Sequence, residues 1–455
     1  MILISLSGYF LYRAIPLGTA YKAKVLCSGV FVSGRSSKSI LTNDIEIDSL
    51  AFLRFFNASI DRENRSVTSS TFGLFERKAI FRPGLGCTLL IGESQELLHQ
   101  NSALFVSQIA VSQNSSDVFL DETNQTELQP SATTINKLNQ VLDDAFSEPP
   151  TKGFRQTRAM IVVLNGRIIA ERYSPEFSSD SALAGWSMAK SVVNTLVGIA
   201  VREGKLSLQD RALLPEWRGK GDQRANITLD MLLRMTDGLD FSENYSNPLD
   251  DVTNMLLGVG NASGYAIHKR LAASPGQRWS YSSGTTNILA KVLRNAYRGS
   301  DRDYLTIPRT ELFDRLSMYN AIIEPDASGT FVGSSFMYAT ARDWARLGCL
   351  YLQDGVWNGN RILPEGWVAY STTPTPQSPN GEYGAHFWLK INRRSEESKA
   401  IAVPKNANFA LGYEGQLLAV VPSHNLVIVR LGLTTRSEAW SHAAFVFQVL
   451  RALEG

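Results

Sequence analysis

Two pairs of short, largely apolar segments stand near opposite ends of the chain's C-terminal two thirds, and each pair is joined by residues typical of turns. Met160–Leu164 and Arg167–Tyr173 flank Asn165-Gly166, the dipeptide most typical of a two-residue hairpin. Leu417–Val421 and Leu426–Leu431 flank a second polar turn that contains a proline. We therefore predict two antiparallel hairpins.

Helical spacing of apolar residues surrounds these hairpins. Ile135–Phe146 has an amphipathic pattern and Ser437–Leu453 follows the second hairpin. Strands from both ends of one region, with mostly helical sequence between them, predict one antiparallel sheet flanked by helices, an α/β (α+β) fold over residues 133–455. The middle, from about Leu213 to Met318, is predicted to be a separate helical lobe, with a cleft between it and the sheet.

The N-terminal third has a different pattern. Residues 1–13 begin with an apolar run, and residues 14–132 form an extension that we expect to be rich in strands. Its strand-like pieces are Lys22–Val32 and Ser69–Phe81, whereas Ser112–Thr134 is rich in Ser, Thr, Asn and acidic residues, as linkers are. We interpret the extension as a cover packed on the catalytic region.

Composition fits a large folded protein and narrows its partners. The chain has 455 residues, 44% of them hydrophobic, and its 45 basic and 43 acidic residues give a formal charge of +2. This balance gives no reason to expect nucleic acid or an anionic membrane surface as a partner. We expect a small-molecule substrate. We expect no metal or other cofactor, because the histidines show no ligand spacing at positions 99, 268, 386, 424 and 442.

The first candidate for chemistry is Ser187, which lies three residues before Lys190 at the start of a long apolar run. Residues three apart on a helix lie on one face, so the amine can reach the hydroxyl. A lysine can take the serine proton only when burial or a nearby cation favours its neutral form. The apolar residues that follow indicate burial, so the pair is a candidate nucleophile and base.

Two later segments carry further candidates. Tyr281 and Ser283 stand just before a helical pattern, where a phenol could relay a proton between nucleophile and leaving group. A hydrogen-bonded turn tyrosine and an N-cap serine are the alternative. The third segment, Leu411–Gln416, contains two glycines directly before a strand-like run, and its backbone N–H groups could bind an oxyanion.

In this order the three segments resemble the serine β-lactamase and penicillin-binding superfamily. The chain is most similar to its class C-like branch, which includes esterases and 6-aminohexanoate-dimer hydrolases. The resemblance implies a β-lactamase/transpeptidase-like fold, with Ser187 as the acylated nucleophile and Lys190 as the general base. It also implies that Tyr281 completes the proton relay and that the backbone N–H groups of Ser187 and Gln416 form the oxyanion hole.

Departures from the family pattern bear on the substrate. Tyr413-Glu414-Gly415 stands where penicillin-recognising relatives carry Lys-Thr-Gly, so the cation that holds a substrate carboxylate is absent. Tyr281-Ser282-Ser283 is similar to the form found in 6-aminohexanoate-dimer hydrolases. We therefore expect a serine hydrolase acting on ester or linear amide bonds. We expect Glu414 to point away from the cleft by strand alternation. Tyr245 is a further candidate for substrate contact, or a solvent-covered loop residue. A catalytically silent receptor or scaffold, and a true β-lactamase or DD-peptidase, are the alternatives.

The N-terminus and the cysteines bear on location. The apolar run in residues 1–13 is shorter than the roughly 20 residues that span a bilayer. We expect it to be part of a signal anchor, and the protein to be exported, periplasmic or otherwise extracytoplasmic, with a membrane tether. A secretory signal segment and a cytoplasmic enzyme are alternatives. A Cys27–Cys87 disulfide would fit an oxidising compartment; two separate buried thiols are the other possibility, and Cys349 lies in an apolar helical run.

Overall fold

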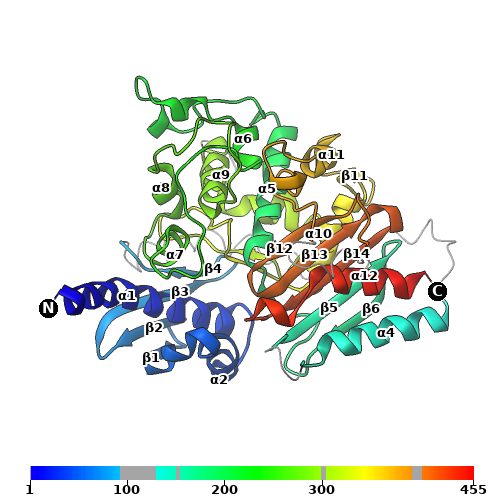
Figure 1. Cartoon of the computed structure of the whole chain (residues 1–455), viewed down its shortest axis with the longest axis horizontal. Coiled ribbons are helices and arrows are strands. Elements are labelled where there is room, and N and C mark those ends of the chain that lie inside the picture. Colours follow the sequence, from blue (N-terminus) through cyan, green and yellow to red (C-terminus); the bar gives the residue numbers. More distant parts are fainter. Residues whose placement is uncertain (1, 93–129, 150–153, 299–303, 392–401, 455) are drawn as a thin grey trace. The chain divides into compact units, whose positions relative to one another are not determined.

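The computed structural model describes residues 2–92, 130–149, 154–298, 304–391 and 402–454 (Figure 1). The chain divides into two compact units. The first contains residues 1–111, 210–306 and 322–338, and the second contains residues 112–209, 307–321 and 339–455. The predicted domain boundaries at residues 13 and 132 stay predictions, and residues 112–129 of the predicted linker lie outside the described residues.

The second unit is built on the sheet that the hairpins predicted. Its five antiparallel strands lie in the order β12-β13-β14-β5-β6, and α4 and α12 cover one face while α10 packs on the other (Figure 1). The elements of this unit are α4 (Ala132–Phe146), β5 (Thr157–Leu164), β6 (Arg167–Tyr173), β7 (Leu183–Ala184), α5 (Ala189–Arg202), α10 (Ala341–Leu352), β10 (Val356–Trp357), β11 (Asn360–Arg361), α11 (Trp367–Thr372), β12 (Asn408–Gly412), β13 (Gln416–Val421), β14 (Leu426–Gly432) and α12 (His442–Leu453).

Both predicted hairpins are confirmed. In the first, Leu164 pairs with Arg167 across Asn165 and Gly166, whose φ angles of 50° and 76° are the left-handed values of the expected turn. In the second, Val421 pairs with Leu426. Every residue of β13 and β14 is buried, because helices cover both faces of the sheet. The core of the unit therefore lies on the two sides of these strands.

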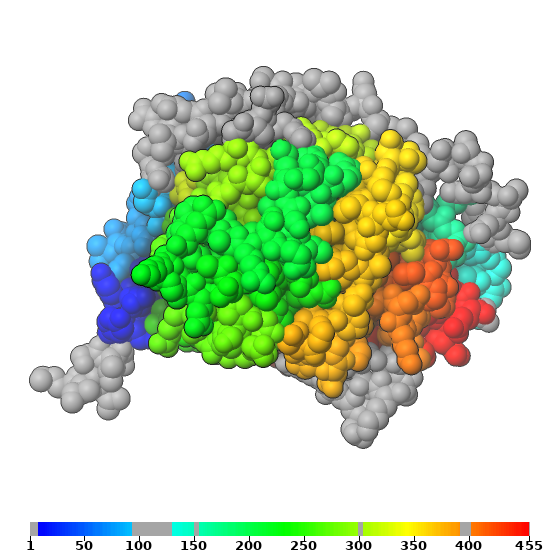
Figure 2. All heavy atoms as spheres, turned by 90° about the horizontal axis from the view of Figure 1, so that it is seen from above, coloured from blue at the N-terminus to red at the C-terminus, as the bar shows by residue number. Residues whose placement is uncertain are grey.

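The first unit joins a four-stranded antiparallel sheet, in the order β1-β2-β3-β4, to α1 and a set of short helices. Figure 2 shows the dark blue residues of α1 at an outer surface of this unit. Its elements are α1 (Ile2–Phe31), α2 (Ser37–Ile40), β1 (Asn57–Asp61), β2 (Ser66–Thr71), β3 (Leu74–Arg82), β4 (Gly86–Leu89), α6 (Leu229–Leu233), α7 (Asp251–Leu257), α8 (Ala262–Ile267), α9 (Ser283–Ala296), β8 (Ile322–Ile323) and β9 (Met337–Ala339).

The prediction of a strand at Lys22–Val32 is wrong, because all but its last residue belong to α1. Among the buried residues of this segment, Ala23, Cys27 and Val30 lie three or four positions apart, which is helical spacing. The other strand-like piece, Ser69–Phe81, is a hairpin in which Phe72 and Gly73 turn the chain between β2 and β3.

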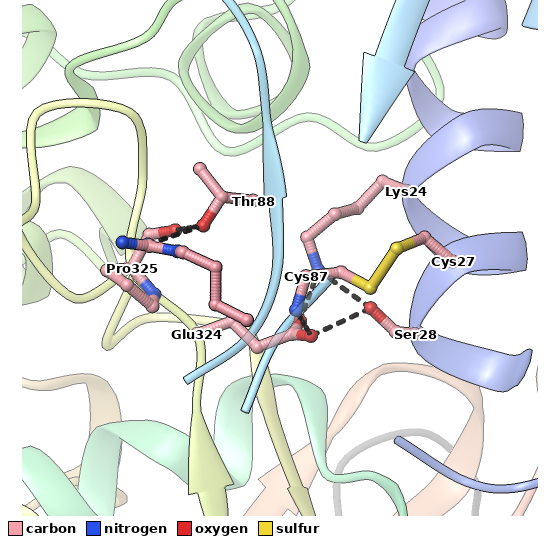
Figure 3. The surroundings of a disulfide bond; sticks show 8 residues. Lys24, Cys27, Ser28, Cys87, Thr88, Glu324 and Pro325 are labelled. Atoms are coloured by element: carbon pink, nitrogen blue, oxygen red, sulfur yellow. Dashed lines mark hydrogen bonds and ion pairs between the residues drawn. A yellow bond between two sulfur atoms is a disulfide. The ribbon is translucent and has the colours of Figure 1, made fainter. Parts of the chain in front are cut away.

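A disulfide joins Cys27 of α1 to Cys87 of β4 (Figure 3). Beside it the carboxylate of Glu324, fully buried, forms an ion pair with Lys24 and accepts hydrogen bonds from Ser28 Oγ (2.8 Å) and the backbone N–H of Cys87 (2.6 Å). Burial lowers the pKa of Lys24, and the charge of Glu324 opposes this shift. The disulfide and the ion pair thus attach α1 firmly to its own unit.

Candidate active site

Ser187 and Lys190 meet at the start of α5. Ser187 lies in the 3₁₀ turn Trp186–Met188, and α5 begins two residues after it. The Lys190 amine donates to Ser187 Oγ at 2.9 Å, and Lys190 is only 1% exposed. The i,i+3 contact expected from the sequence is therefore present, and the lysine is buried.

Close packing fixes the backbone directly before Ser187. A Cβ at Gly185 would lie 2.3 Å from the Trp344 ring, and a Cβ at Gly412 would lie 2.2 Å from the Gly185 carbonyl oxygen. Trp186 has a φ of 48°, a left-handed value that a tryptophan adopts only when its surroundings impose it. The position of Ser187 is thus set by contacts of its neighbours.

The Trp186 side chain contacts the segment that the resemblance assigns to substrate binding. Its indole N–H donates to Glu414 Oε2 at 3.0 Å, and its ring lies edge-on to Tyr413 with centroids 5.9 Å apart. Tyr413 is 49% exposed, and desolvation of its hydroxyl followed by the charge of Glu414 raises its pKa, so the phenol stays protonated. A carboxylate therefore lies beside the residue that precedes Ser187.

The expectation that Glu414 points away by strand alternation is wrong. β12 ends at Gly412 and β13 begins at Gln416, so Tyr413–Gly415 is a 3₁₀ turn in which Glu414 has a φ of 63°. The two-residue period of strands does not apply to a turn, and the Glu414 side chain reaches Trp186.

Buried polar groups hold this turn in place. Arg430 is fully buried and donates to the Gly415 carbonyl at 2.8 Å, while the Thr434 N–H donates to the Glu414 carbonyl at 2.8 Å. The Gln416 side-chain amide donates to the Gly432 carbonyl at 2.6 Å and accepts from the Gly432 N–H at 3.0 Å. Burial lowers the pKa of Arg430 to about 9. The backbone around Gln416 is therefore rigidly supported, as a preorganised oxyanion donor requires.

The remaining candidates form a group in the first unit. Ser283 is the first residue of α9, and its Oγ and N–H both donate to the Glu243 carboxylate, at 2.6 and 2.8 Å. The Tyr245 hydroxyl donates to the same carboxylate at 2.5 Å. The N-cap of α9 is Ser282, whose hydroxyl accepts from the Thr285 N–H. Ser283 is thus not the N-cap, and Glu243 gathers two of the predicted site residues.

Tyr281 and Glu243 both contribute to the pKa of Tyr245 within this group. Desolvation of its hydroxyl, followed by the nearby Glu243 and Tyr281, raises the pKa of Tyr245, so this phenol remains a hydrogen-bond donor. The Tyr245 side chain is 48% exposed, which leaves its ring open to solvent. Sequence reasoning missed Glu243 and Trp186, although each lies within two residues of a predicted site residue.

Among the described residues, no group of three or more His, Cys, Asp or Glu side chains could hold a metal ion. Cys349, the cysteine outside the disulfide, is buried, and burial raises the pKa of its thiol to about 12.

An antiparallel sheet covered by helices, with a serine and a buried lysine three residues apart, defines the class of serine β-lactamases and their relatives. The model of the family described as Beta-lactamase matches residues 142–444, more than half of the chain. The chain therefore belongs to this family, which confirms the resemblance found in the sequence.

Individual relatives agree with this assignment. A 6-aminohexanoate-dimer hydrolase of Paenarthrobacter ureafaciens is 26% identical over 325 residues, which cover 66% of this chain and 79% of that protein. A family VIII carboxylesterase has a TM-score of 0.53 at 14% identity, over 72% of this chain and 99% of its own. A penicillin-binding protein homologue from Caulobacter crescentus has a TM-score of 0.54 at 14% identity, again over 72% of this chain and 99% of its own. These structures share the fold, so the predicted fold class is confirmed.

Proposed function

We propose that the protein is a serine hydrolase that cleaves ester or linear amide bonds of small substrates through an acyl-enzyme at Ser187. The observation that carries this proposal is the 2.9 Å contact between Ser187 Oγ and the amine of Lys190, a residue 1% exposed. A buried amine next to a serine hydroxyl is an arrangement that activates the hydroxyl as a nucleophile.

The proposed reaction has two steps. Lys190 accepts the proton of Ser187 as Oγ attacks the substrate carbonyl, and the leaving group departs with a proton relayed by Tyr281. The backbone N–H groups of Ser187 and Gln416 stabilise the negative oxygen of the intermediate. Water then attacks the acyl-enzyme, which releases the acid and restores Ser187.

The charge of the third segment supports a choice of substrate. Glu414 places a carboxylate beside Trp186, and Tyr413 offers an exposed ring and no cation. A substrate carboxylate bound there would be repelled rather than held. We therefore expect esters and uncharged linear amides to be cleaved in preference to β-lactams. The names of two relatives, a 6-aminohexanoate-dimer hydrolase and a carboxylesterase, agree with this choice.

We further propose that the protein works outside the cytoplasm. The disulfide between Cys27 and Cys87 supports an oxidising compartment, because cytosolic thiols are kept reduced. The apolar residues at the N-terminus support export with attachment to a membrane.

The test combines active-site labelling with a substrate panel. A fluorophosphonate probe should label Ser187, and Ser187→Ala should abolish both the labelling and ester turnover. The control is Ser423→Ala, which should change neither, because Ser423 is an exposed serine on the β13–β14 turn. The panel contains a p-nitrophenyl ester, a linear 6-aminohexanoate dimer, a D-Ala-D-Ala peptide and nitrocefin. An adduct on another residue contradicts the mechanism, and absence of any adduct supports a receptor or scaffold. Nitrocefin turned over faster than the ester contradicts the substrate choice alone.

A further inference from the structure

Large apolar side chains are exposed mainly in one part of the molecule. Of the eleven exposed large hydrophobic side chains among the described residues, eight lie between residues 9 and 74, all in the first unit. A water-soluble surface normally shows such side chains scattered singly. We call these eight the N-terminal apolar surface: Tyr9, Phe10, Leu11, Tyr12, Phe52, Phe55, Phe72 and Leu74.

Three elements that pack together contribute this surface. The Tyr12 ring of α1 lies edge-on to Phe75 of β3, 5.8 Å between centroids, next to the turn that carries Phe72. The 3₁₀ helix Asp48–Phe55, which carries Phe52, packs on the adjacent side of α1. There the amine of Lys22 donates to the Phe56 carbonyl at 2.7 Å. The elements that carry these side chains therefore all pack against α1.

The exposed start of α1 is apolar on every side. Tyr9, Phe10, Leu11 and Tyr12 are consecutive, and each is 43–62% exposed. Consecutive helical residues point about 100° apart, so four of them face all directions. A partner protein would cover one stripe of such a helix, whereas a lipid phase surrounds it.

Arginines border these aromatic side chains. Arg13 donates to the Tyr9 hydroxyl at 3.0 Å, and the guanidinium of Arg54 lies 5.8 Å from the centroid of the Phe55 ring. Of the three basic residues of α1, Arg13 is exposed, whereas Lys22 and Lys24 are buried in ion pairs with Glu46 and Glu324. Arginine beside exposed aromatic rings fits the boundary between lipid phosphates and acyl chains.

α1 is also fixed to its unit, so whatever binds its exposed end positions the whole unit. The Cys27–Cys87 disulfide and the ion pair of Lys24 with Glu324 hold its C-terminal half (Figure 3). Its first turns extend beyond the β1–β4 sheet (Figure 1).

We propose that the N-terminal apolar surface docks the protein onto the surface of a membrane that contains anionic lipids. Tyr9, Phe10, Leu11 and Tyr12 enter the acyl boundary, and Arg13 and Arg54 contact lipid phosphates. This inference deepens the membrane attachment proposed above, on which it rests, by naming the surface and the class of lipid; it does not depend on the hydrolase activity.

The experiment is flotation of the full chain with phosphatidylcholine vesicles, with and without phosphatidylglycerol as the anionic component. The native chain should float, and more strongly when phosphatidylglycerol is present. The double variant Phe10→Ser with Leu11→Ser should lower the partition coefficient by about tenfold or more, because two apolar side chains no longer leave water. Arg13→Gln with Arg54→Gln should remove the response to phosphatidylglycerol.

Phe154→Ser is the matched control, because Phe154 is 53% exposed in the second unit, outside this surface. It should float like the native chain. Unchanged circular dichroism shows that the double variants are folded. Equal flotation of the Phe10 and Leu11 variant, or no flotation of the native chain on either vesicle, overturns the proposal. A concentration-dependent dimer that this variant abolishes assigns the surface to a second copy of the chain and also overturns it.

Discussion

Trp186→Phe tests whether a side chain outside the reacting groups positions the oxyanion donors. Phenylalanine keeps an aromatic ring against Tyr413 but removes the indole N–H that donates to Glu414 at 3.0 Å. Trp186 directly precedes Ser187, and Glu414 lies two residues before Gln416. Their hydrogen bond therefore ties together the two segments that carry the proposed oxyanion donors.

The size of the effect follows from this bond. A hydrogen bond to a charged acceptor contributes about 1.5–3 kcal/mol, and the partly exposed Glu414 belongs at the lower end. About 1.4 kcal/mol is tenfold in rate. Complete loss of one oxyanion donor costs about 10²–10³ in kcat. Both donors remain in the variant, so we expect kcat to fall by about 10- to 100-fold, with little change in KM.

The assay is steady-state ester hydrolysis by a double-mutant cycle. Glu414→Ala should lower kcat as Trp186→Phe does, the double variant should be no worse than either, and Glu414→Gln should retain part of the rate because its amide oxygen can still accept. Trp367→Phe is the matched control, because it removes another indole hydrogen bond, to Asn194 Oδ1 at 3.0 Å, and should alter stability more than kcat. Native kcat in Trp186→Phe, or additive losses in the double variant, would refute the positioning role.

Four other changes have defined outcomes. Lys190→Ala should lower kcat/KM by several orders of magnitude. Lys190→Arg should be equally inactive at every pH tested, because a guanidinium stays protonated and cannot accept the serine proton. Tyr281→Phe should lower ester turnover by about 10²–10⁴ with folding intact by circular dichroism. Glu324→Gln should lower the free energy of unfolding in urea by about 3–5 kcal/mol, since it leaves Lys24 charged and buried, and adding Lys24→Met should recover much of the loss. Burial raises the pKa of Asp343 from 3.8 to about 6, so between these pH values the folded chain holds a proton that the unfolded chain has lost. The free energy of unfolding should therefore fall as pH rises from about 4 to about 6. Asp343→Asn should make the urea midpoint depend less on pH over this range.

Local patterns were enough to predict the features that depend on neighbouring residues. The turn at Asn165 and Gly166 and the largely apolar segments beside it predicted the first hairpin correctly, because both signals lie within a few residues. The contact of Ser187 with Lys190 was predictable for the same reason, since it spans one helical turn.

Contacts between distant residues were beyond sequence reasoning. Trp186 and Glu414 are 228 positions apart, and Glu243 and Ser283 are 40 apart, so no local periodicity links them. The orientation of Glu414 was wrong because a turn interrupts the strand. The strand predicted at Lys22–Val32 was wrong because the segment continues a long helix that begins 20 residues earlier, at Ile2.

The ion pair of Lys24 with Glu324 has a consequence for synthesis of the chain. Cys27 and Cys87 are 60 positions apart, so the ribosome delivers both early. Glu324 follows Lys24 by 300 positions and is made only after the chain has twice entered the second unit and returned to the first. At synthesis rates of about 5–20 residues per second, Glu324 is made on the order of tens of seconds after Lys24. During that interval the Lys24 amine stays in water, because burial of the charged amine without its counter-charge is costly.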